Sequence, residues 1–235
     1  MNLSETAKKA INAYGGMETW SNASHIEAEV SVKGLAFVLK GRPFFNHAKI
    51  FAKVQTPFCK ITPIGKKAEI SGILDGNNVR LETQDGKILA ERLNARRYFF
   101  SLRRNFWWDD LDMAYFANYA FWNYMTLPAL LIRADIAWTE VQSGTLEARF
   151  PGHLPTHCTN QYFKFDPESG LLIQHNYTAE VISKYANAAN VVLEHKSNNG
   201  MTYFNSRQVT PSIRDGSALK FPILIDIKIF NFSLT

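Results

Sequence analysis

Two histidines in the second half of the chain offer proton-transfer chemistry near neutral pH. His157 lies in the segment FPGHLPTHCTNQYFKFD, and His175 follows in LLIQHNYT. Imidazole titrates close to pH 7, so a positioned histidine can accept or donate a proton during a reaction. We predict that both histidines belong to a catalytic site.

The same segment also holds residue types that zinc prefers, since His153, His157 and Cys158 fall within six positions. Their spacing matches no standard zinc signature, and Pro155 argues against a helical pair of histidines. The sequence contains no glycine-rich nucleotide-binding loop and no G-x-S-x-G elbow. We therefore expect no metal and no other cofactor, and keep a His/Asp metal-dependent enzyme as an alternative.

The segment from 107 to 125, WWDDLDMAYFANYAFWNYM, brings carboxylates and tyrosines into one stretch of chain. It lacks Gly and Pro, which predicts a helix over 109–125. Asp112 and Tyr119 lie seven residues apart, two helical turns on one face. We predict that both face His157 or His175, so that a ligand meets a proton donor and a proton acceptor. The alternative for Asp112 is a capping role, because it follows Asp109 by three residues.

Aromatic residues make up 13% of the chain, and many of them gather in and before this helix. Aromatic side chains can line a ligand cavity, although rings at helical spacing can also simply pack in a core. Arg97 is predicted to hold an acidic or carbonyl group of the ligand by paired hydrogen bonds. The rings predicted to form the ligand wall are Trp107, Trp108, Tyr115, Trp122 and Tyr124.

The rest of the chain reads mainly as strands. A short amphipathic helix that starts after Ser4 ends at Gly15-Gly16, and from His25 apolar and polar residues alternate. Two Asp-Gly pairs indicate hairpin turns. We predict one domain over 1–235: a single large curved antiparallel sheet, a half-barrel or barrel, wrapped around the central helix. The predicted strands lie near 25–33, 35–40, 48–54, 58–64, 67–74, 79–84, 87–93, 130–142, 145–150, 160–166, 171–182, 188–195, 201–209 and 222–233.

Composition excludes several classes of protein. With 46% hydrophobic and 20% charged residues, the chain can build a large core, and no apolar run is long enough for a membrane span. The net charge of +5 is too modest to predict a nucleic-acid partner. Two distant cysteines and the absence of an apolar signal segment predict a cytoplasmic location.

The opening residues resemble a known family. The run Ala10-x-x-Ala13-Tyr14-Gly15-Gly16-x-Glu18-x-Trp20, a helix that ends before a meander of strands, is similar to the start of periplasmic lipoprotein-carrier (LolA/LolB-like) domains and their half-barrel relatives. The resemblance covers about the first twenty residues. It implies a curved antiparallel sheet over a helix plug, with a hydrophobic cavity that holds acyl chains.

These observations lead to two hypotheses of different kinds. The first is an enzyme that binds a hydrophobic small molecule in the barrel cavity and acts on it by acid/base chemistry, such as isomerisation, cyclisation or hydration. The alternative is a non-catalytic carrier or sensor of a lipid-like ligand. The oligomeric state is not predicted from the sequence.

Overall fold

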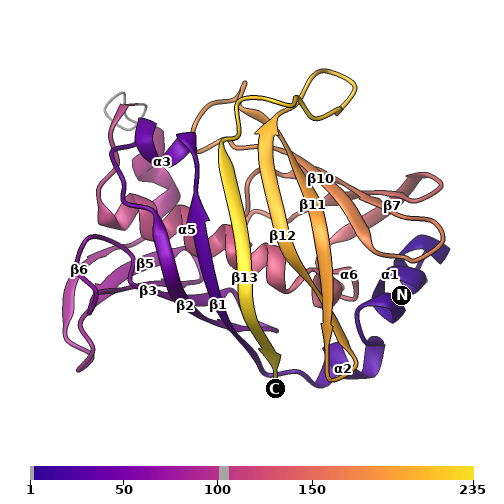
Figure 1. Cartoon of the computed structure of the whole chain (residues 1–235), viewed down its shortest axis with the longest axis horizontal. Coiled ribbons are helices and arrows are strands. Elements are labelled where there is room, and N and C mark those ends of the chain that lie inside the picture. The colour runs from indigo at the N-terminus through magenta and orange to yellow at the C-terminus, as the bar shows by residue number, and fades with distance from the viewer. Residues whose placement is uncertain (1–2, 101–105) are drawn as a thin grey trace.

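All the strands of the computed structural model, which describes residues 3–100 and 106–235, belong to one antiparallel sheet (Figure 1). Its order from edge to edge is β6-β5-β4-β3-β2-β1-β13-β12-β11-β10-β9-β8-β7. The sheet curves without closing, so the prediction of a half-barrel is confirmed. The strands are β1 (His25–Lys33), β2 (Phe45–Lys53), β3 (Phe58–Thr62), β4 (Ser71–Asp75), β5 (Asn78–Glu82), β6 (Ile88–Arg92), β7 (Ala137–Gln142), β8 (Thr145–Arg149), β9 (Asn160–Phe165), β10 (Leu172–Thr178), β11 (Asn187–Asn198), β12 (Met201–Pro211) and β13 (Ile225–Leu234).

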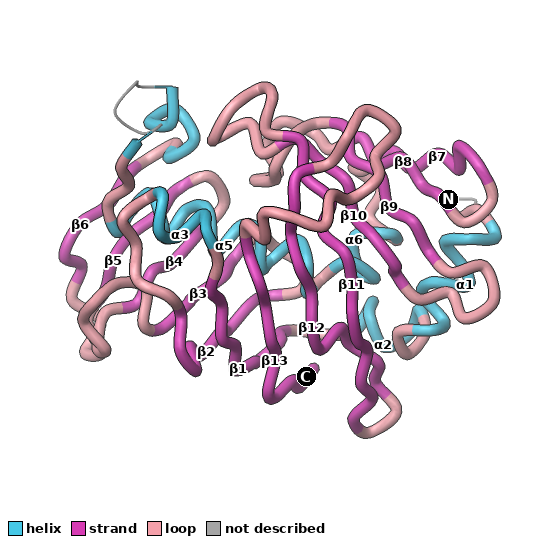
Figure 2. Tube along the Cα trace, turned by 45° about the horizontal axis from the view of Figure 1, so that its top comes forward, coloured by secondary structure: helices cyan, strands magenta, loops and turns pink. Residues whose placement is uncertain are grey.

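The helices lie on the concave side and at the ends of the sheet (Figure 2). The longest, α5, crosses behind the sheet and packs against β3, β4 and β5. None of the helices in the described part of the chain is long and apolar enough to cross a membrane. The helical elements are α1 (Glu5–Ala13), α2 (Met17–Asn22), α3 (Leu35–Leu39), the 3₁₀ helix η1 (Ala95–Phe100), α5 (Asp110–Met125) and α6 (Leu127–Leu131).

The central helix begins where the sequence predicts. Asp109 is the N-cap, and its side chain accepts a hydrogen bond from the Asp112 amide while Asp112 accepts one from the Asp109 amide. This reciprocal capping box satisfies two amide groups that the first helical turn would leave open. Every residue from 111 to 125 is buried, so this helix forms the centre of the core.

A glycine allows this helix to approach the sheet closely. A Cβ atom on Gly72 of β4 would lie 2.8 Å from the Ala114 Cβ and 2.6 Å from a side-chain carbon of Ile64. The Asn118 side chain donates hydrogen bonds to the Gly72 carbonyl at 3.1 Å and to the Ala114 carbonyl at 2.7 Å. The small residues thus set the distance between helix and sheet, and the amide side chain fixes their register.

The N-terminal helix also matches its prediction. The Ser4 hydroxyl accepts a hydrogen bond from the Ala7 amide, and Gly15 and Gly16 follow the helix with φ angles of 107° and 91°. Most residues avoid this backbone region, and glycine enters it freely. Residues next to the helix in the sequence therefore determine where it begins and where it ends.

Two predicted strands are wrong. Residues 35–39 form α3, because the Leu35 and Ala36 amides bond to the carbonyls of Ile223 and Leu224 and pull this apolar run against another loop. The predicted strand at 130–142 is divided, since 127–131 form α6 and β7 begins only at Ala137. Pro128 lies in the first turn of α6, where its missing amide proton is not needed.

Candidate functional site

Three tyrosines surround His157 in the space between α5 and the sheet. The Tyr119 hydroxyl lies 3.2 Å from Nδ1 of His157, and the Tyr124 hydroxyl lies 2.9 Å from Nε2. The Tyr177 ring stacks on the imidazole with centroids 3.7 Å apart and planes 6° apart. Both ring nitrogens of His157 are therefore engaged, and the imidazole is fixed in one orientation.

His175 lies beside this group on β10, the strand that also carries Tyr177. Its ring centroid is 6.3 Å from that of His157, and its Nε2 atom is 2.7 Å from Oε1 of Gln161. The Phe163 ring stacks on it with centroids 4.1 Å apart. The structure thus brings His157 to Tyr119, whereas the ring that His175 meets on the helix is that of Tyr124, with centroids 6.0 Å apart.

The protein interior keeps these groups uncharged. Burial lowers the pKa values of His157 and His175 well below their usual value, and the positive charge of Arg207 lowers both further. Burial raises the pKa values of Tyr119 and Tyr177 well above the ordinary tyrosine value. At neutral pH the cluster is therefore a network of neutral donors and acceptors.

Asp112 does not join this cluster, and the predicted pairing of its carboxylate with a histidine is wrong. Its side chain is fully buried at the start of α5, where it accepts a hydrogen bond from Arg92 at 2.7 Å and completes the capping box. The same arginine also pairs with Asp109. The carboxylate thus belongs to an ion-pair network two helical turns from Tyr119.

The predicted aromatic wall divides into three groups. Tyr124 belongs to the histidine cluster, and Tyr115 stands edge-on to Tyr119 at 5.2 Å. Trp108 and Trp122 are core residues, and the indole of Trp122 donates a hydrogen bond to the Lys53 carbonyl at 2.9 Å. Trp107 is about half exposed at one end of the sheet.

The arginine that turns toward the cluster is the residue just before the predicted one. Arg97 is exposed, whereas Arg96 turns inward and donates to the carbonyls of Thr156 at 2.6 Å and His157 at 3.0 Å. Arg96 also pairs with Glu180 at 2.6 Å. Its guanidinium therefore supports the loop that carries His157, and its hydrogen-bonding groups are already in use.

A second arginine, which the sequence reasoning missed, lies in the same enclosed region. Arg207 of β12 is 1% exposed, and its guanidinium packs between the rings of Tyr124 and Phe204. Its Nε and Nη2 groups have no hydrogen-bond partner, and no carboxylate in the described ranges pairs with it. The sequence held a signal for it: Arg207 alternates with Val209, so a charge occupies the apolar face of a strand.

The sheet divides directly next to Arg207. Strands β12 and β13 pair only over 206–209 and 225–228, and beyond this point β13 pairs only with β1. Figure 1 shows the two strands spreading apart toward the C-terminus. We call this opening the seam: residues 201–205 of β12 on one side and 229–234 of β13 on the other. The rings of Tyr203 and Phe232 stack across it with centroids 4.9 Å apart.

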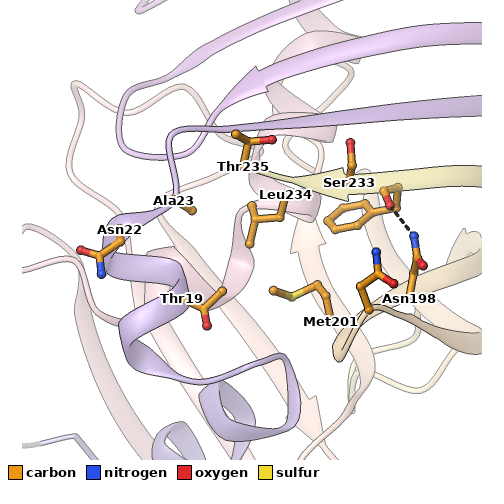
Figure 3. A pocket seen from close by; sticks show the side chains of 10 residues that line it. Thr19, Asn22, Ala23, Asn198, Met201, Ser233, Leu234 and Thr235 are labelled. Carbon is orange, nitrogen blue, oxygen red and sulfur yellow. Dashed lines mark hydrogen bonds between the residues drawn. The ribbon is translucent and has the colours of Figure 1, made fainter.

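Two clefts meet at the seam. One, of about 380 Å³, lies at its lower end between α2, the β11–β12 hairpin and the end of β13 (Figure 3). There Asn198 donates a weak hydrogen bond of 3.4 Å to the Phe232 carbonyl. The second cleft, of about 1140 Å³, follows the outer face of the sheet and is also lined by Asn198, Tyr203 and Phe232. The stacked rings of Tyr203 and Phe232 therefore separate open clefts from the buried Phe204 and Arg207.

The residues that the structure describes include no set of side chains arranged as ligands of a metal ion. No three His, Cys, Asp or Glu side chains come together there as ligands of a metal ion. His153, the other histidine of this segment, is exposed, and its Nε2 atom lies 3.0 Å from Oδ2 of Asp135. Cys158 is a free, buried thiol that donates to the Asn160 carbonyl.

Comparison with known proteins identifies the fold. No protein-family model matches the sequence, and no curated protein is similar to it. The structure is similar to that of a LolA superfamily protein from Nitrosomonas europaea, with a TM-score of 0.54, 6% identity and coverage of 100% of this chain and 94% of the other. It is also similar to a DUF1329 family protein from Desulfovibrio piger, with a TM-score of 0.50, 11% identity and coverage of 97% and 93%. A domain from Vibrio parahaemolyticus described as an outer membrane lipoprotein-sorting domain gives a TM-score of 0.48, 10% identity and coverage of 98% and 91%.

These likenesses correct the predicted location. The prediction of a cytoplasmic location is not upheld, since the chain shares its fold with a LolA superfamily protein. The cysteine argument fails for a physical reason: Cys59 and Cys158 are both buried, and burial raises the pKa of the Cys158 thiol to about 11. Buried thiols of this kind are inert under oxidising and reducing conditions alike. The sequence resemblance covers about the first twenty residues, whereas the likeness in fold to the LolA superfamily protein covers the whole chain.

Proposed function

We propose that this protein is a carrier or sensor that binds an amphipathic, anionic, lipid-like molecule inside the half-barrel. The acidic group of the ligand would bind Arg207, and its apolar part would lie along the seam and the inner wall. The observation that carries this proposal is the unpartnered Nε–Nη2 edge of a fully buried guanidinium. These two groups point in the same direction and match the two oxygens of a carboxylate.

The surroundings of Arg207 support an anion rather than a neutral ligand. The titratable groups that act on its charge are the tyrosines at 124, 14 and 177, all neutral at pH 7. Burial lowers the pKa of Arg207, because an isolated charge loses its hydration in the protein interior. A bound carboxylate would supply the missing counter-charge and satisfy both free N–H groups.

The seam supports entry of a long apolar molecule. Beside it the sheet lacks backbone hydrogen bonds between β12 and β13, so separating Tyr203 from Phe232 breaks side-chain contacts only. Phe204 lies behind these rings and contacts the Arg207 guanidinium at 4.5 Å. A chain that passes the stacked pair would therefore reach an apolar wall that ends at a cation.

The acid/base role predicted for Tyr119, His157 and His175 stays a prediction. Both nitrogens of His157 already have hydroxyl partners, and the carboxylate expected to orient a histidine lies in the Arg92 network. These features favour a role in which the cluster shapes and supports the binding site. Mass analysis of a bound ligand before and after incubation would reveal any conversion.

The binding test compares two ligands that differ only in the head group. Oleate and oleyl alcohol compete with fluorescent cis-parinaric acid for the wild type, Arg207→Met and the surface control Arg97→Met. We expect the wild type and Arg97→Met to prefer oleate by about 10- to 100-fold, the range for a hydrogen bond to a charged group. Arg207→Met should lose this preference. Equal affinity of the wild type for the acid and the alcohol would refute the proposal.

A further inference from the structure

The most exposed large apolar side chains of the described residues gather at one end of the half-barrel. They are Phe100 at 80% exposure, Phe106 at 79%, Tyr185 at 76% and Phe221 at 74%. Soluble proteins scatter single apolar residues over their surface, but a concentration of large rings marks an interaction site. We call this end the aromatic edge and define it by residues 34–44, 95–100, 106–109, 179–186 and 212–222.

Contacts join these five segments to one another, among them that of the Phe99 and Trp108 rings, whose centroids lie 5.4 Å apart. The Leu35 amide bonds to the Ile223 carbonyl just after the last segment, and the Trp108 amide bonds to the Lys40 carbonyl at 3.3 Å. The ion pair of Arg96 with Glu180 connects the second segment to the fourth. In Figure 1 the segments lie along the upper rim, opposite the end where the C-terminus lies, and Figure 2 turns this rim toward the viewer.

The helix α3 adds to the apolar character of the rim. Of its five residues only Phe37 is buried, while Val38 and Leu39 are strongly exposed. The neighbouring Phe44 is half exposed. A short helix that turns its apolar side chains outward is stable here only because backbone bonds to the 212–224 loop hold it.

The aromatic edge is also the basic part of the protein. Its segments contain Lys or Arg at 40, 42, 96, 97, 184, 214 and 220, but Asp or Glu only at 109, 180 and 215. Two of these acids are neutralised, since Asp109 pairs with Arg92 and Glu180 pairs with Arg96. Of the basic residues, those at 97, 184, 214 and 220 are exposed and form no ion pair within the described ranges. Since Arg42 pairs with Asp110 just outside these segments, the exposed charge of the edge consists of these four cations and the single carboxylate of Asp215.

We propose that the aromatic edge docks on the surface of an anionic lipid bilayer. Exposed rings interleaved with Lys and Arg are the composition that binds the headgroup region, where the rings insert and the cations meet lipid phosphates. The exposed rings come from several separate segments of the chain rather than from one helix or strand, which suits a plane better than a single peptide or helix. In this orientation the seam remains at the opposite end, away from the bilayer.

Vesicle co-sedimentation tests the proposal with two matched pairs of variants. The charge pair compares Lys184→Gln/Lys220→Gln on the edge with Lys53→Gln/Lys196→Gln at the opposite end. The apolar pair compares Phe100→Ser/Tyr185→Ser on the edge with Ile173→Ser/Leu193→Ser on strands β10 and β11. All four positions of each pair are exposed, and thermal melts confirm that each variant is folded.

We expect the wild type to bind vesicles of phosphatidylglycerol and phosphatidylcholine, and to bind pure phosphatidylcholine far more weakly. The edge charge variant should bind the anionic vesicles about thirtyfold more weakly, given the attraction of two lysines to such a surface. The edge apolar variant should lose binding to both kinds of vesicle, and the two control variants should match the wild type. Failure of the wild type to bind anionic vesicles, or equal losses in the controls, would overturn the proposal. Arg207→Met should bind vesicles normally, which separates this proposal from the ligand site.

Discussion

The guanidinium carbon of Arg207 lies 4.7 Å from the centre of the Tyr124 ring, and this contact joins strand β12 to the last turn of α5. The Tyr124 hydroxyl continues the connection, since it bonds to His157 at 2.9 Å and to Tyr177 at 2.8 Å. Arg207 is thus a cation at one end of a contact network whose other members are neutral. Because nothing negative balances this cation among the described residues, the network has the chemistry of a binding site for an anion.

Because Arg207 has no counter-charge and Arg96 has one, replacing these arginines should change the free energy of unfolding in opposite directions. Arg207→Met removes a buried, uncompensated charge and keeps an apolar side chain of similar length. It should leave the free energy of unfolding unchanged or raise it by about 1–3 kcal/mol, as replacement of buried charged groups by apolar residues can do. Urea denaturation of the ligand-free protein measures this change.

The matched variant is Arg96→Met, because Arg96 faces the same cluster but has its partners. It should lower the free energy of unfolding by about 2–4 kcal/mol, since two backbone carbonyls and Glu180 lose their donor. If Arg207→Met destabilised the protein as much as Arg96→Met, the guanidinium of Arg207 would be a satisfied structural group instead.

The buried histidines predict that acid weakens the fold. Burial lowers the pKa values of His157 and His175 well below the usual 6.5, and burial together with Arg207 lowers that of His195 to about 4. The histidines of the unfolded chain therefore bind protons near pH 6.5, whereas the same histidines stay unprotonated in the native protein. Stability should be complete above pH 7 and fall below about pH 6.5, with a slope of up to about 1.4 kcal/mol per pH unit for each histidine.

Denaturation at a series of pH values measures this slope, and NMR of the imidazole groups assigns it. His175→Gln should reduce the slope, because it removes one of the groups. Titration of His157 or His175 near pH 6.5 in the native protein would contradict the expectation.

The sheet was predictable because its signal is local. In β1 the apolar residues at 26, 28, 30 and 32 alternate with polar ones, and these four are the buried positions of the strand. The run LAFVL at 35–39 has no such alternation, so periodicity could not distinguish a strand from a helix there. Hydrogen bonds to the 212–224 loop, nearly two hundred residues away, stabilise the helix.

The candidate site was predictable only in part. Helical spacing predicted that Tyr119 faces the sheet, and its hydroxyl lies 3.2 Å from Nδ1 of His157. His157 itself lies in the loop before β9, where strand periodicity predicts no position. The position of Arg207 depends on β13 inserting between β1 and β12, a pairing between distant segments that no local pattern specifies. For Asp112 the sequence left two roles open, and the partner that decides between them, Arg92, lies on an edge strand.

The close approach of α5 to the sheet predicts a sharp difference between two glycines. Gly72→Ala would place a methyl group 2.8 Å from the Ala114 Cβ, so helix and sheet must move apart. We expect a loss of about 1–3 kcal/mol in unfolding free energy, typical of overpacking. Gly152→Ala is the control, because its added Cβ meets no atom within 4 Å, and it should be neutral or slightly stabilising. Similar melting temperatures for the two variants would mean that the helix packs less tightly than the structure shows.

The position of Asp112 predicts a structural role that a double-mutant cycle can measure. Asp112→Asn removes the charge that faces Arg92 at a site with no solvent exposure, so we expect a loss of about 3 kcal/mol in unfolding free energy. Arg92→Met leaves the same carboxylate unpaired and should lose a similar amount, whereas the double variant should lose clearly less than the sum. Denaturation of the four proteins gives this coupling energy. Because Asp112 lies outside the histidine cluster, the folded Asp112→Asn variant should still prefer oleate over oleyl alcohol, and a lost preference would place this carboxylate in the binding site after all.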